Sequence, residues 1–313
     1  MSLLKKILVT GGSGLVGNAI QSIQNKYSNK YIFIFVSSKD YNLYNFNDTI
    51  KMFNEYKPDY VIHLAANVGG LYKNMNNKVE MLEINNMINF NVVKCAHDFN
   101  VKKLVACLST CIFPDNVIYP INETMLHDGP PHFSNDAYAY SKRMLEVHCR
   151  AYRENYNDNF VCIIPTNIYG KYDNFDLEAG HVLPSLINKC YLAKKNNIDF
   201  IVRGTGKPLR QFIYSNDLAE LILIVLNKFE ENNIILSVSE NSEVSIKDVA
   251  TIIAECFDYK DRIVFDSNFS DGQYKKTVSN SKLNNLVPDF EFTSIQDGIK
   301  ETVEWFINKQ NNS

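Results

Sequence analysis

Short apolar runs alternate with longer segments of mixed polarity through the first half of the chain. The runs lack the alternation of polar and apolar positions that marks a half-exposed strand, which indicates strands buried on both faces. The segments between them are long enough to form helices. On this pattern we expect strands at residues 6–10, 31–36, 60–65, 103–108 and 160–164, and helices at residues 18–26, 48–56, 83–100 and 137–156.

The alternation of strands and helices predicts an α/β fold with a Rossmann-like, doubly wound parallel sheet and right-handed crossovers. After Pro165 the pattern becomes irregular, and residues 166–184 are loop-like. We therefore expect residues 1–165 to form the sheet domain, with residues 211–236 returning to it. Residues 166–313 are expected to form mainly a smaller C-terminal α/β domain that binds the substrate.

The composition suits a chain with a sizeable core, because 45% of its 313 residues are hydrophobic and 21% are charged. A formal net charge of −3 supplies no basic field, so nucleic acid is not an expected partner. No apolar run approaches the roughly 20 residues of a membrane helix, and the N-terminal apolar run leads into a glycine-rich loop instead of a signal cleavage site. We therefore expect no membrane contact.

Seven scattered cysteines form no CxxC pair and no cluster with metal-ligand spacing, which favours free thiols in a reducing cytoplasm and no metal site.

A glycine-rich loop, GGSGLVG, follows the first expected strand and precedes the first expected helix. Gly11, Gly14 and Gly17 form GxxGxxG, in which glycines permit the tight turn, the approach of the backbone to a pyrophosphate and close packing of helix on strand. The N-terminus of the following helix offers free N–H groups to the anion. We expect this loop, including Leu15 and Val16, to bind a dinucleotide.

The end of the second strand discriminates between the two nicotinamide dinucleotides. An NAD site places a carboxylate there to bind the ribose 2′-hydroxyl. This chain instead has Ser37, Ser38 and Lys39, and Asp40 comes only after them. Two hydroxyls and an ammonium suit a 2′-phosphate better, so these three residues predict NADP(H). The alternative is that Lys39 is only a solvated surface charge.

A serine, a tyrosine and a lysine are placed for chemistry on a carbonyl group. Tyr138 and Lys142 are four residues apart on an expected helix and share one face, whereas Tyr140 does not face Lys142. Ser109 follows the fourth strand, at the sheet edge where a doubly wound fold binds its ligand. We expect Lys142 to lower the pKa of Tyr138, and Tyr138 to exchange a proton with a carbonyl oxygen while hydride moves at the carbon.

Together these features resemble the extended short-chain dehydrogenase/reductase superfamily, most of whose members act on nucleotide-activated sugars. Further blocks, in order over nearly the whole chain, are similar to those of its GDP-4-dehydro-6-deoxy-D-mannose 3,5-epimerase/4-reductases; they are ILVTGGSGLVG, VIHLAANVGG, LSTCIFP, YAYSKRM, IPTNIYGKYDNF, GHVLP, LRQFIYSNDLA and SDGQYKKT. CIFP after Ser-Thr and GHVLP after PTNIYGKYDNF are the most specific of them. The resemblance implies an enzyme that epimerises C3 and C5 and reduces C4 with NADPH, to give GDP-L-fucose.

The same resemblance implies roles for two further side chains. A ketone at C4 acidifies the hydrogens on C3 and C5, so a base can remove each proton and an acid can return one on the opposite face. A thiol and an imidazole both titrate near neutrality. By resemblance Cys111 is the base and His181 the acid, while Ser109 and Tyr138 hold the C4 oxygen.

Other residues are interpreted from their neighbours. Cys107, within the fourth strand, is assigned to the core, and His63 is read as structural or next to the cofactor. By resemblance the contacts of the cofactor also include Ala65, Tyr138, Lys142 and His181.

The resemblance also implies contacts of the second domain with the GDP-sugar. The residues implied are Asn167, Val182, Lys189, Arg203, Arg210 and Lys276. One departure is visible, since some members of the group have Trp where this chain has Arg203. A stacking contact is then replaced by a guanidinium or lost. The group usually dimerises through two long helices, here 83–100 and 137–156, so we expect a homodimer.

Two alternatives remain open at this point. One is another NAD(P)-dependent nucleotide-sugar epimerase or dehydratase, which re-uses its oxidised cofactor. A dehydratase requires an Asp-Glu pair at the positions that Cys111 and Ile112 occupy in this chain. The other is a non-catalytic, dinucleotide-binding sensor. That class typically loses the tyrosine or the lysine, and both Tyr138 and Lys142 are present.

Overall fold

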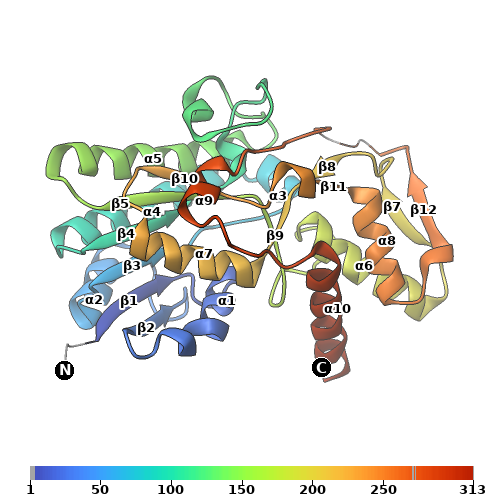
Figure 1. The fold of residues 1–313 in the computed structure, drawn as a ribbon, viewed down its shortest axis with the longest axis horizontal. Coiled ribbons are helices and arrows are strands. Elements are labelled where there is room, and N and C mark those ends of the chain that lie inside the picture. The colour runs from blue at the N-terminus through green and yellow to red at the C-terminus, as the bar shows by residue number, and fades with distance from the viewer. Residues whose placement is uncertain (1–3, 270, 272, 313) are drawn as a thin grey trace.

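The structure is a computed structural model that describes residues 4–269, 271 and 273–312, with only the backbone of residues 71–73. Six parallel strands of the described chain form a central sheet in the order β10-β5-β4-β3-β1-β2 (Figure 1). These strands are β1 (Lys5–Thr10), β2 (Tyr31–Val36), β3 (Tyr60–His63), β4 (Lys103–Cys107), β5 (Phe160–Pro165) and β10 (Asn233–Leu236).

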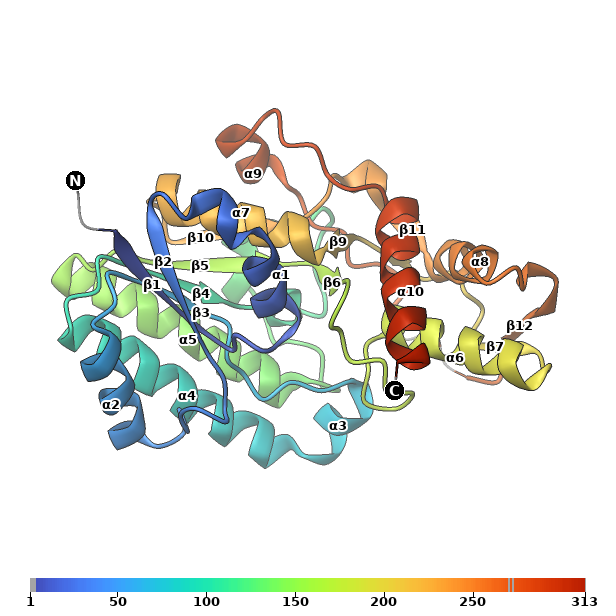
Figure 2. The ribbon, with the colours of Figure 1, turned by 90° about the horizontal axis from the view of Figure 1, so that it is seen from below.

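Helices cover both faces of this sheet (Figure 2). One face carries α1 (Leu15–Ile23) and α7 (Ser215–Lys228), and the other carries α2 (Phe46–Tyr56), α4 (Lys78–Asp98) and α5 (Asp136–Tyr156). Successive strand residues point to opposite faces, so Leu8 and Leu104 join the core under α4 and α5 while Ile7 and Val105 join the core under α1 and α7. The predicted doubly wound α/β fold is confirmed.

The boundaries of the predicted elements differ from the observed ones by a few residues. The largest differences are at helix starts: α1 begins at Leu15 instead of residue 18, and α4 at Lys78 instead of residue 83. Gly14 is the N-cap of α1, so the helix leaves the glycine loop directly. The first turn of α4 carries exposed residues such as Val79, which gave no sign of a buried face.

A second group of elements packs around its own core, which includes Tyr169, Phe200 and Phe306. Its strand pairs are β6 (Asn167–Tyr169) with β9 (Phe212–Tyr214), β7 (Phe200–Arg203) with β12 (Ile263–Asp266), and β8 (Leu209–Arg210) with β11 (Val244–Ser245). Its helices are α6 (Val182–Asn196), α8 (Ile246–Cys256) and α10 (Ile295–Asn311). Two short helices, α3 (Leu71–Asn76) and α9 (Ser281–Leu286), lie outside it.

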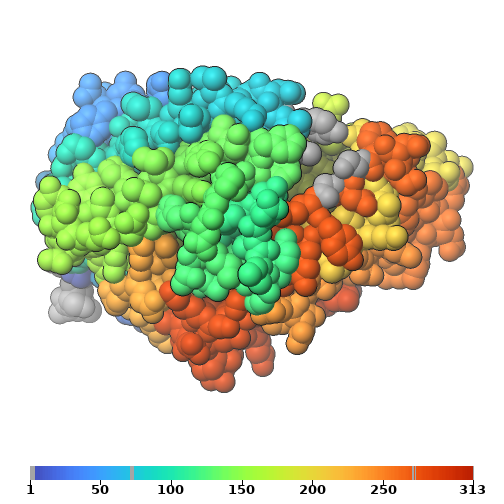
Figure 3. Space-filling view, turned by 90° about the horizontal axis from the view of Figure 1, so that it is seen from above, coloured from blue at the N-terminus to red at the C-terminus, as the bar shows by residue number. Residues whose placement is uncertain are grey.

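A strand-like contact joins a loop of the first half to the C-terminal part of the chain. Ile121 donates its N–H to the carbonyl of Thr277 at 3.0 Å and accepts the N–H of Ser279 at 2.7 Å. The Tyr119 hydroxyl donates to the carbonyl of Lys275 at 2.6 Å. In Figure 3 this contact lies where the green segment meets the orange one. Among the described residues, no helix has the length and apolar character needed to cross a membrane.

Candidate active site

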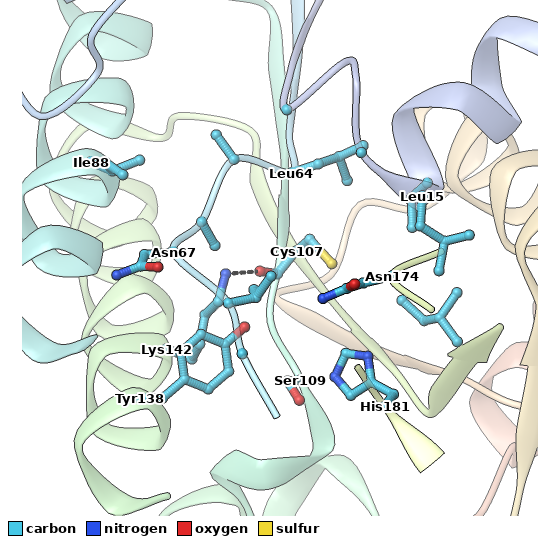
Figure 4. A pocket seen from close by; sticks show the side chains of 18 of the residues that line it. Leu15, Leu64, Asn67, Ile88, Cys107, Ser109, Tyr138, Lys142, Asn174 and His181 are labelled. Atoms are coloured by element: carbon cyan, nitrogen blue, oxygen red, sulfur yellow. Dashed lines mark hydrogen bonds between the residues drawn. The ribbon is translucent and has the colours of Figure 1, made fainter. Parts of the chain in front are cut away.

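A cleft of about 1830 Å³ runs along the carboxyl ends of the central strands. The strand order reverses between β1 and β3, and ligands of doubly wound folds bind at this switch point. The walls come from both halves of the chain: the glycine loop and the ends of β3 and β4 on one side, and the segment from Pro165 to Pro184 on the other (Figure 4).

The glycine loop has the close packing that a dinucleotide site needs. Gly11 has a φ of +72°, and a Cβ there would lie 2.8 Å from the backbone nitrogen of Ala65. A Cβ on Gly17 would clash with the carbonyl oxygen of Gly12. Side chains at these positions would fill the cradle, which therefore fits a bound pyrophosphate. The predicted residues that line the cleft here are Gly11, Gly14, Leu15, Val16, Gly17 and Ala65.

The residues after β2 are partly engaged with one another. Ser37 and Ser38 line the cleft, whereas Lys39 is exposed beside it. Ser37 donates both its N–H and its hydroxyl to Oδ2 of Asp40, each at 2.7 Å. The Ser37 hydroxyl lowers the pKa of Asp40, which stays an anion. Of the three predicted residues, Ser38 and Lys39 are thus the two whose side chains remain to bind a phosphate at this end of the cleft.

Tyr138 and Lys142 lie on one face of α5, as predicted, and both line the cleft. The ammonium of Lys142 donates to the carbonyl oxygen of Cys107 at 2.7 Å and lies 5.8 Å from the centre of the Tyr138 ring (Figure 4). We expected Lys142 to bring the pKa of Tyr138 below its usual value, but in this structure burial has the larger effect and the net shift is upward. Burial, followed by the neighbouring Cys111 and Cys107, raises the pKa of Tyr138 well above its usual value, and burial lowers the pKa of Lys142. Tyr138 is therefore a protonated phenol at neutral pH, ready to donate.

Ser109 and Cys111 lie at the start of a short 3-10 helix, Thr110–Ile112. Ser109 is its N-cap, and Oγ of Ser109 accepts the N–H of Cys111 at 3.4 Å. Ser109 lines the cleft, whereas Cys111 is only 8% exposed and lies behind the wall. Burial raises the pKa of Cys111, and the positive charge of Lys276 opposes that shift. The thiol is protonated at neutral pH unless a ligand changes its surroundings.

Cys107 was assigned to the core, and the structure confirms this only in part, because the side chain packs against the core under α1 and α7 and also reaches the cleft. Its side chain is half-buried and lines the cleft at the end of β4 (Figure 4). The strand ends at Cys107, so its side chain lies at the border between this core and the cleft. His63 is structural: it is 1% exposed, its Nδ1 lies 2.8 Å from the Thr10 hydroxyl, and its Nε2 lies 3.1 Å from Oδ1 of Asn89.

His181 is the N-cap of α6 and reaches the cleft from the second half of the chain. Its side chain is exposed to the cleft, yet the surrounding protein desolvates the imidazole and lowers its pKa. The loop before it is held by α10, since Tyr172 packs against Trp305 with ring centres 4.8 Å apart and Lys171 pairs with Glu301 at 2.9 Å. His181 therefore faces Ser109 across the cleft from an anchored loop (Figure 4).

The predicted substrate residues divide into two sets. Asn167 and Val182 line the cleft, and Asn167 is held by its Nδ2, which donates to the carbonyl of Gln211 at 2.8 Å. The four cations are not part of the cleft wall as the described residues define it; they are Lys189, Arg203, Arg210 and Lys276. Lys276 is close enough to Cys111 for each to shift the pKa of the other, so it lies next to the catalytic end.

The other three cations have different surroundings. Arg210 is occupied with the backbone, because its guanidinium donates to the carbonyls of Leu209 at 2.6 Å and Gln273 at 2.7 Å. Lys189 and Arg203 lie near each other, and burial followed by Arg203 lowers the pKa of Lys189. The guanidinium carbon of Arg203 lies 4.7 Å from the centre of the exposed Phe269 ring.

Two cleft residues, Asp173 and Asn174, were not singled out from the sequence. They follow Tyr172, whose φ of +69° is unusual for a side chain of this size. Oδ2 of Asp173 is buried and has no hydrogen-bond partner in the described part of the chain. Only the family block PTNIYGKYDNF pointed to this loop, without distinguishing these two residues. Among the described residues, no group of three or more His, Cys, Asp and Glu side chains is placed to hold a metal ion.

Comparison with known proteins identifies the relatives of this chain. Residues 7–238 match the model of the NAD dependent epimerase/dehydratase family. A GDP-L-fucose synthase of Dictyostelium discoideum is 54% identical over 97% of this chain and 96% of that protein. A probable GDP-L-fucose synthase of Drosophila melanogaster is 46% identical over 97% of this chain and 98% of that protein. A crystal structure of a GDP-L-fucose synthetase from Naegleria fowleri bound to NADP superposes with a TM-score of 0.95, at 48% identity, over 100% of this chain and 96% of that one.

Proposed function

The chain belongs to the NAD dependent epimerase/dehydratase family, and from this premise we propose that it is a GDP-L-fucose synthase that converts GDP-4-dehydro-6-deoxy-D-mannose into GDP-L-fucose with NADPH. The family predicted from the sequence is thereby confirmed. The observation that carries the proposal is the arrangement at one cleft: Ser109, Tyr138 and Lys142 line it together with His181, and Cys111 lies behind its wall, two residues beyond Ser109. Ser109, Tyr138 and Lys142 are suited to the reduction of a ketone. His181 and Cys111 are suited to proton exchange at the carbons next to that ketone.

The cofactor is NADP(H), which when bound supplies the hydride for C4 of the sugar. The glycine loop and the N-terminus of α1 would hold its diphosphate, and Ser38 and Lys39 its 2′-phosphate. Lys142 and Tyr138 lie at the opposite end of the cleft, at the tip of β4, where the nicotinamide end belongs. Ala65 and His181 complete the proposed contacts.

Epimerisation is assigned to Cys111 and His181. The C4 ketone makes the hydrogens on C3 and C5 acidic, and the two side chains approach from different elements, the start of the 3-10 helix and the N-terminus of α6. Cys111 removes the proton as the thiolate, so its thiol must first give up its own proton to solvent; burial opposes this ionisation and the nearby positive charge of Lys276 favours it. His181 returns a proton on the other face, while Ser109 and Tyr138 stabilise the enolate oxygen. Proton transfer of this kind contributes about 10²- to 10⁴-fold in rate.

Reduction follows at the same oxygen. Burial keeps Tyr138 protonated, so its phenol can hydrogen-bond the C4 carbonyl and donate a proton as the alkoxide forms. The buried ammonium of Lys142 then stabilises the phenolate that this transfer leaves behind. Both reactions thus use one ketone, which explains why one site suffices.

The second half of the chain is proposed to bind the GDP-sugar. Asn167 and Val182 would contact the sugar from the cleft wall, and Lys276, next to Cys111, would contact the diphosphate. Arg210 would act chiefly by holding the backbone of residues 273 and 274, given its carbonyl contacts. Lys189 and Arg203 lie farther along and would contact the nucleoside. On this division, residues 1–165 and 211–236 form the NADP-binding domain and the rest of 166–313 mainly the substrate domain, although α9 packs back on β10 of the central sheet.

The enzyme is further proposed to be a cytoplasmic homodimer. Helices α4 and α5 pack on each other and expose large apolar side chains to the surface, among them Leu82, Met87 and Met144. An exposed apolar surface on paired helices suits a second copy of the chain. Seven free cysteines in the described structure fit a reducing compartment.

The proposed function is tested by incubating the purified protein with GDP-4-dehydro-6-deoxy-D-mannose and following the NADPH absorbance, with NADH in parallel. We expect stoichiometric oxidation of NADPH and formation of GDP-L-fucose. A substrate-dependent reaction that leaves the NADPH absorbance constant would assign the protein to the epimerases or dehydratases that re-use their cofactor.

A further inference from the structure

The loop that carries His181 also presents a hydrogen-bond donor to the cleft. Asn174 is exposed there, and its Oδ1 accepts the N–H of Asp176 at 3.1 Å. This bond fixes the orientation of the amide, so that the donor group, Nδ2, is the end that faces the cleft. In Figure 4 the amide of Asn174 points into the cleft, in the region bounded by Leu15, Cys107 and His181. Nδ2 has no hydrogen-bond acceptor within the part of the chain that the structure describes.

The loop around Asn174 is held by several hydrogen bonds. The carboxylate of Asp176 accepts the N–H groups of Glu178 at 2.9 Å and Ala179 at 2.7 Å. Ser185 donates its hydroxyl to the carbonyl of Asp176 at 2.9 Å, which ties the loop to α6. The N–H of Asn174 itself is bound by Oδ1 of Asp173 at 2.7 Å. A donor held this firmly loses little conformational entropy when it binds a ligand.

The same loop is docked against the cofactor side of the cleft. Gly70 donates its N–H to the carbonyl of Ala179 at 3.1 Å. Gly70 belongs to the segment after β3, and Ala65, earlier in that segment, is packed against Gly11 of the glycine loop. The Asn174 loop and the glycine loop are therefore connected through one short segment, and they form opposite walls of one cleft.

We propose that Asn174 is a ligand of the cofactor diphosphate, donating from Nδ2 to a phosphate oxygen on the side that the glycine loop does not cover. The N–H groups at the start of α1 bind the diphosphate from one wall, and a neutral amide donor on the opposite wall is suited to an anionic oxygen. Asn174 then connects cofactor binding with the loop that positions His181. The inference rests on the proposed function only in that the cofactor is NADP(H).

The test is isothermal titration calorimetry of Asn174→Ala with three ligands: NADPH, adenosine 2′-phosphate 5′-diphosphate, and adenosine 2′-phosphate. A hydrogen bond to a charged group corresponds to about 10- to 100-fold in affinity. We expect Asn174→Ala to lower the affinities for NADPH and for adenosine 2′-phosphate 5′-diphosphate by the same factor in that range. The affinity for adenosine 2′-phosphate should stay within about 2-fold of the wild-type value. Wild-type binding of NADPH in the same titrations tests the cofactor independently of Asn174.

Asn122→Ala is the matched control, because Oδ1 of Asn122 accepts the N–H of Thr124 at 3.0 Å in the same kind of turn, away from the cleft wall. It should change none of the three affinities. Unchanged NADPH affinity in Asn174→Ala overturns the proposal, and so does a loss confined to NADPH, which places the contact on the nicotinamide half.

If Asn174→Ala lowers the affinity for all three ligands, the loop has moved. The variant Asn174→Asp then decides whether Asn174 itself contacts the diphosphate. This variant keeps an oxygen for the N–H of Asp176 and replaces the donor by an anion. It must weaken the two diphosphate ligands and spare adenosine 2′-phosphate; an equal effect on all three contradicts the proposal.

Discussion

Lys142 donates its hydrogen bond to the backbone carbonyl of Cys107, at 2.7 Å, and not to the phenol of Tyr138. The bond joins α5 to the carboxyl end of β4, immediately before the segment that carries Ser109 and Cys111. Lys142 is only 2% exposed, so an ammonium is held at the centre of the site by a neutral acceptor. Its position thus sets both the place of Tyr138 relative to Ser109 and the charge that Tyr138 meets when it loses a proton.

Replacing Lys142 by Met tests this arrangement. Met fills a similar volume without the charge, so the phenolate of Tyr138 loses its cation, and NADPH oxidation should fall by about 10²-fold or more. The carbonyl of Cys107 loses its donor, while a buried charge is removed, so the free energy of unfolding should change by less than about 2 kcal/mol. Steady-state kinetics and urea unfolding measure the two effects. Lys94→Met, an exposed lysine on α4, should change neither; wild-type turnover in Lys142→Met contradicts the assignment.

Tyr138→Phe removes the hydroxyl that is the proposed proton donor and keeps the aromatic ring. NADPH oxidation should fall by about 10²- to 10⁴-fold, because the C4 alkoxide then forms without a proton. Binding of NADPH, measured by its fluorescence, should stay within a few-fold of the wild type. Tyr140→Phe is the control, since Tyr140 is exposed on the same helix and does not line the cleft. Equal turnover in both variants would refute the role of Tyr138.

Cys111→Ser separates epimerisation from cofactor binding. A serine hydroxyl is a far weaker acid than a thiol, so solvent deuterium should no longer enter C3 and C5, while NADPH still binds. Mass spectrometry of the recovered nucleotide sugar in deuterium oxide measures the exchange. Cys107→Ser is the matched control, because Cys107 is the thiol that lines the cleft. Exchange that persists in Cys111→Ser and stops in Cys107→Ser would transfer the role of base to Cys107.

Asp173 should make stability depend on pH. Burial raises the pKa of its carboxyl from 3.8 to about 7. Between these values the folded protein holds a proton that the unfolded chain releases, so the contribution of Asp173 to stability falls as the pH rises from about 4 to about 7. Asp173→Asn should remove this loss. The free energy of unfolding of the variant, relative to that of the wild type, should therefore be about 2 to 4 kcal/mol higher at pH 7.5 than at pH 4.5. Urea unfolding at both pH values measures the difference; parallel pH curves for the two proteins contradict a buried, protonated Asp173.

Much of the fold was predictable because its strands are apolar on both faces. Ile7, Leu8 and Val9 are all fully buried, so the first strand has no exposed position to blur its pattern. The glycine loop, Ser109, Tyr138 and Lys142 were predictable for a related reason. In a doubly wound sheet all carboxyl strand ends meet at one edge, so residues distant in sequence converge there.

The rest depends on contacts that no local pattern contains. The direction of the Cys107 side chain follows from where β4 ends, and the preference of Lys142 for a carbonyl follows from the distance between α5 and β4. The raised pKa of Tyr138 depends on how deeply the packing of α5 buries its phenol. Asn174 could not be singled out, since its role follows from a loop that is held by Asp176 and docked on Gly70.

The most direct test of the account is the reaction run to completion in deuterium oxide with NADPH that carries ordinary hydrogen. One site that performs both reactions should give GDP-L-fucose with deuterium at C3 and C5, hydrogen at C4, and one NADPH oxidised for each product molecule. Oxidation of NADPH that yields a 4-reduced sugar without deuterium at C3 or C5 would show a simple ketone reductase and would contradict the roles of Cys111 and His181.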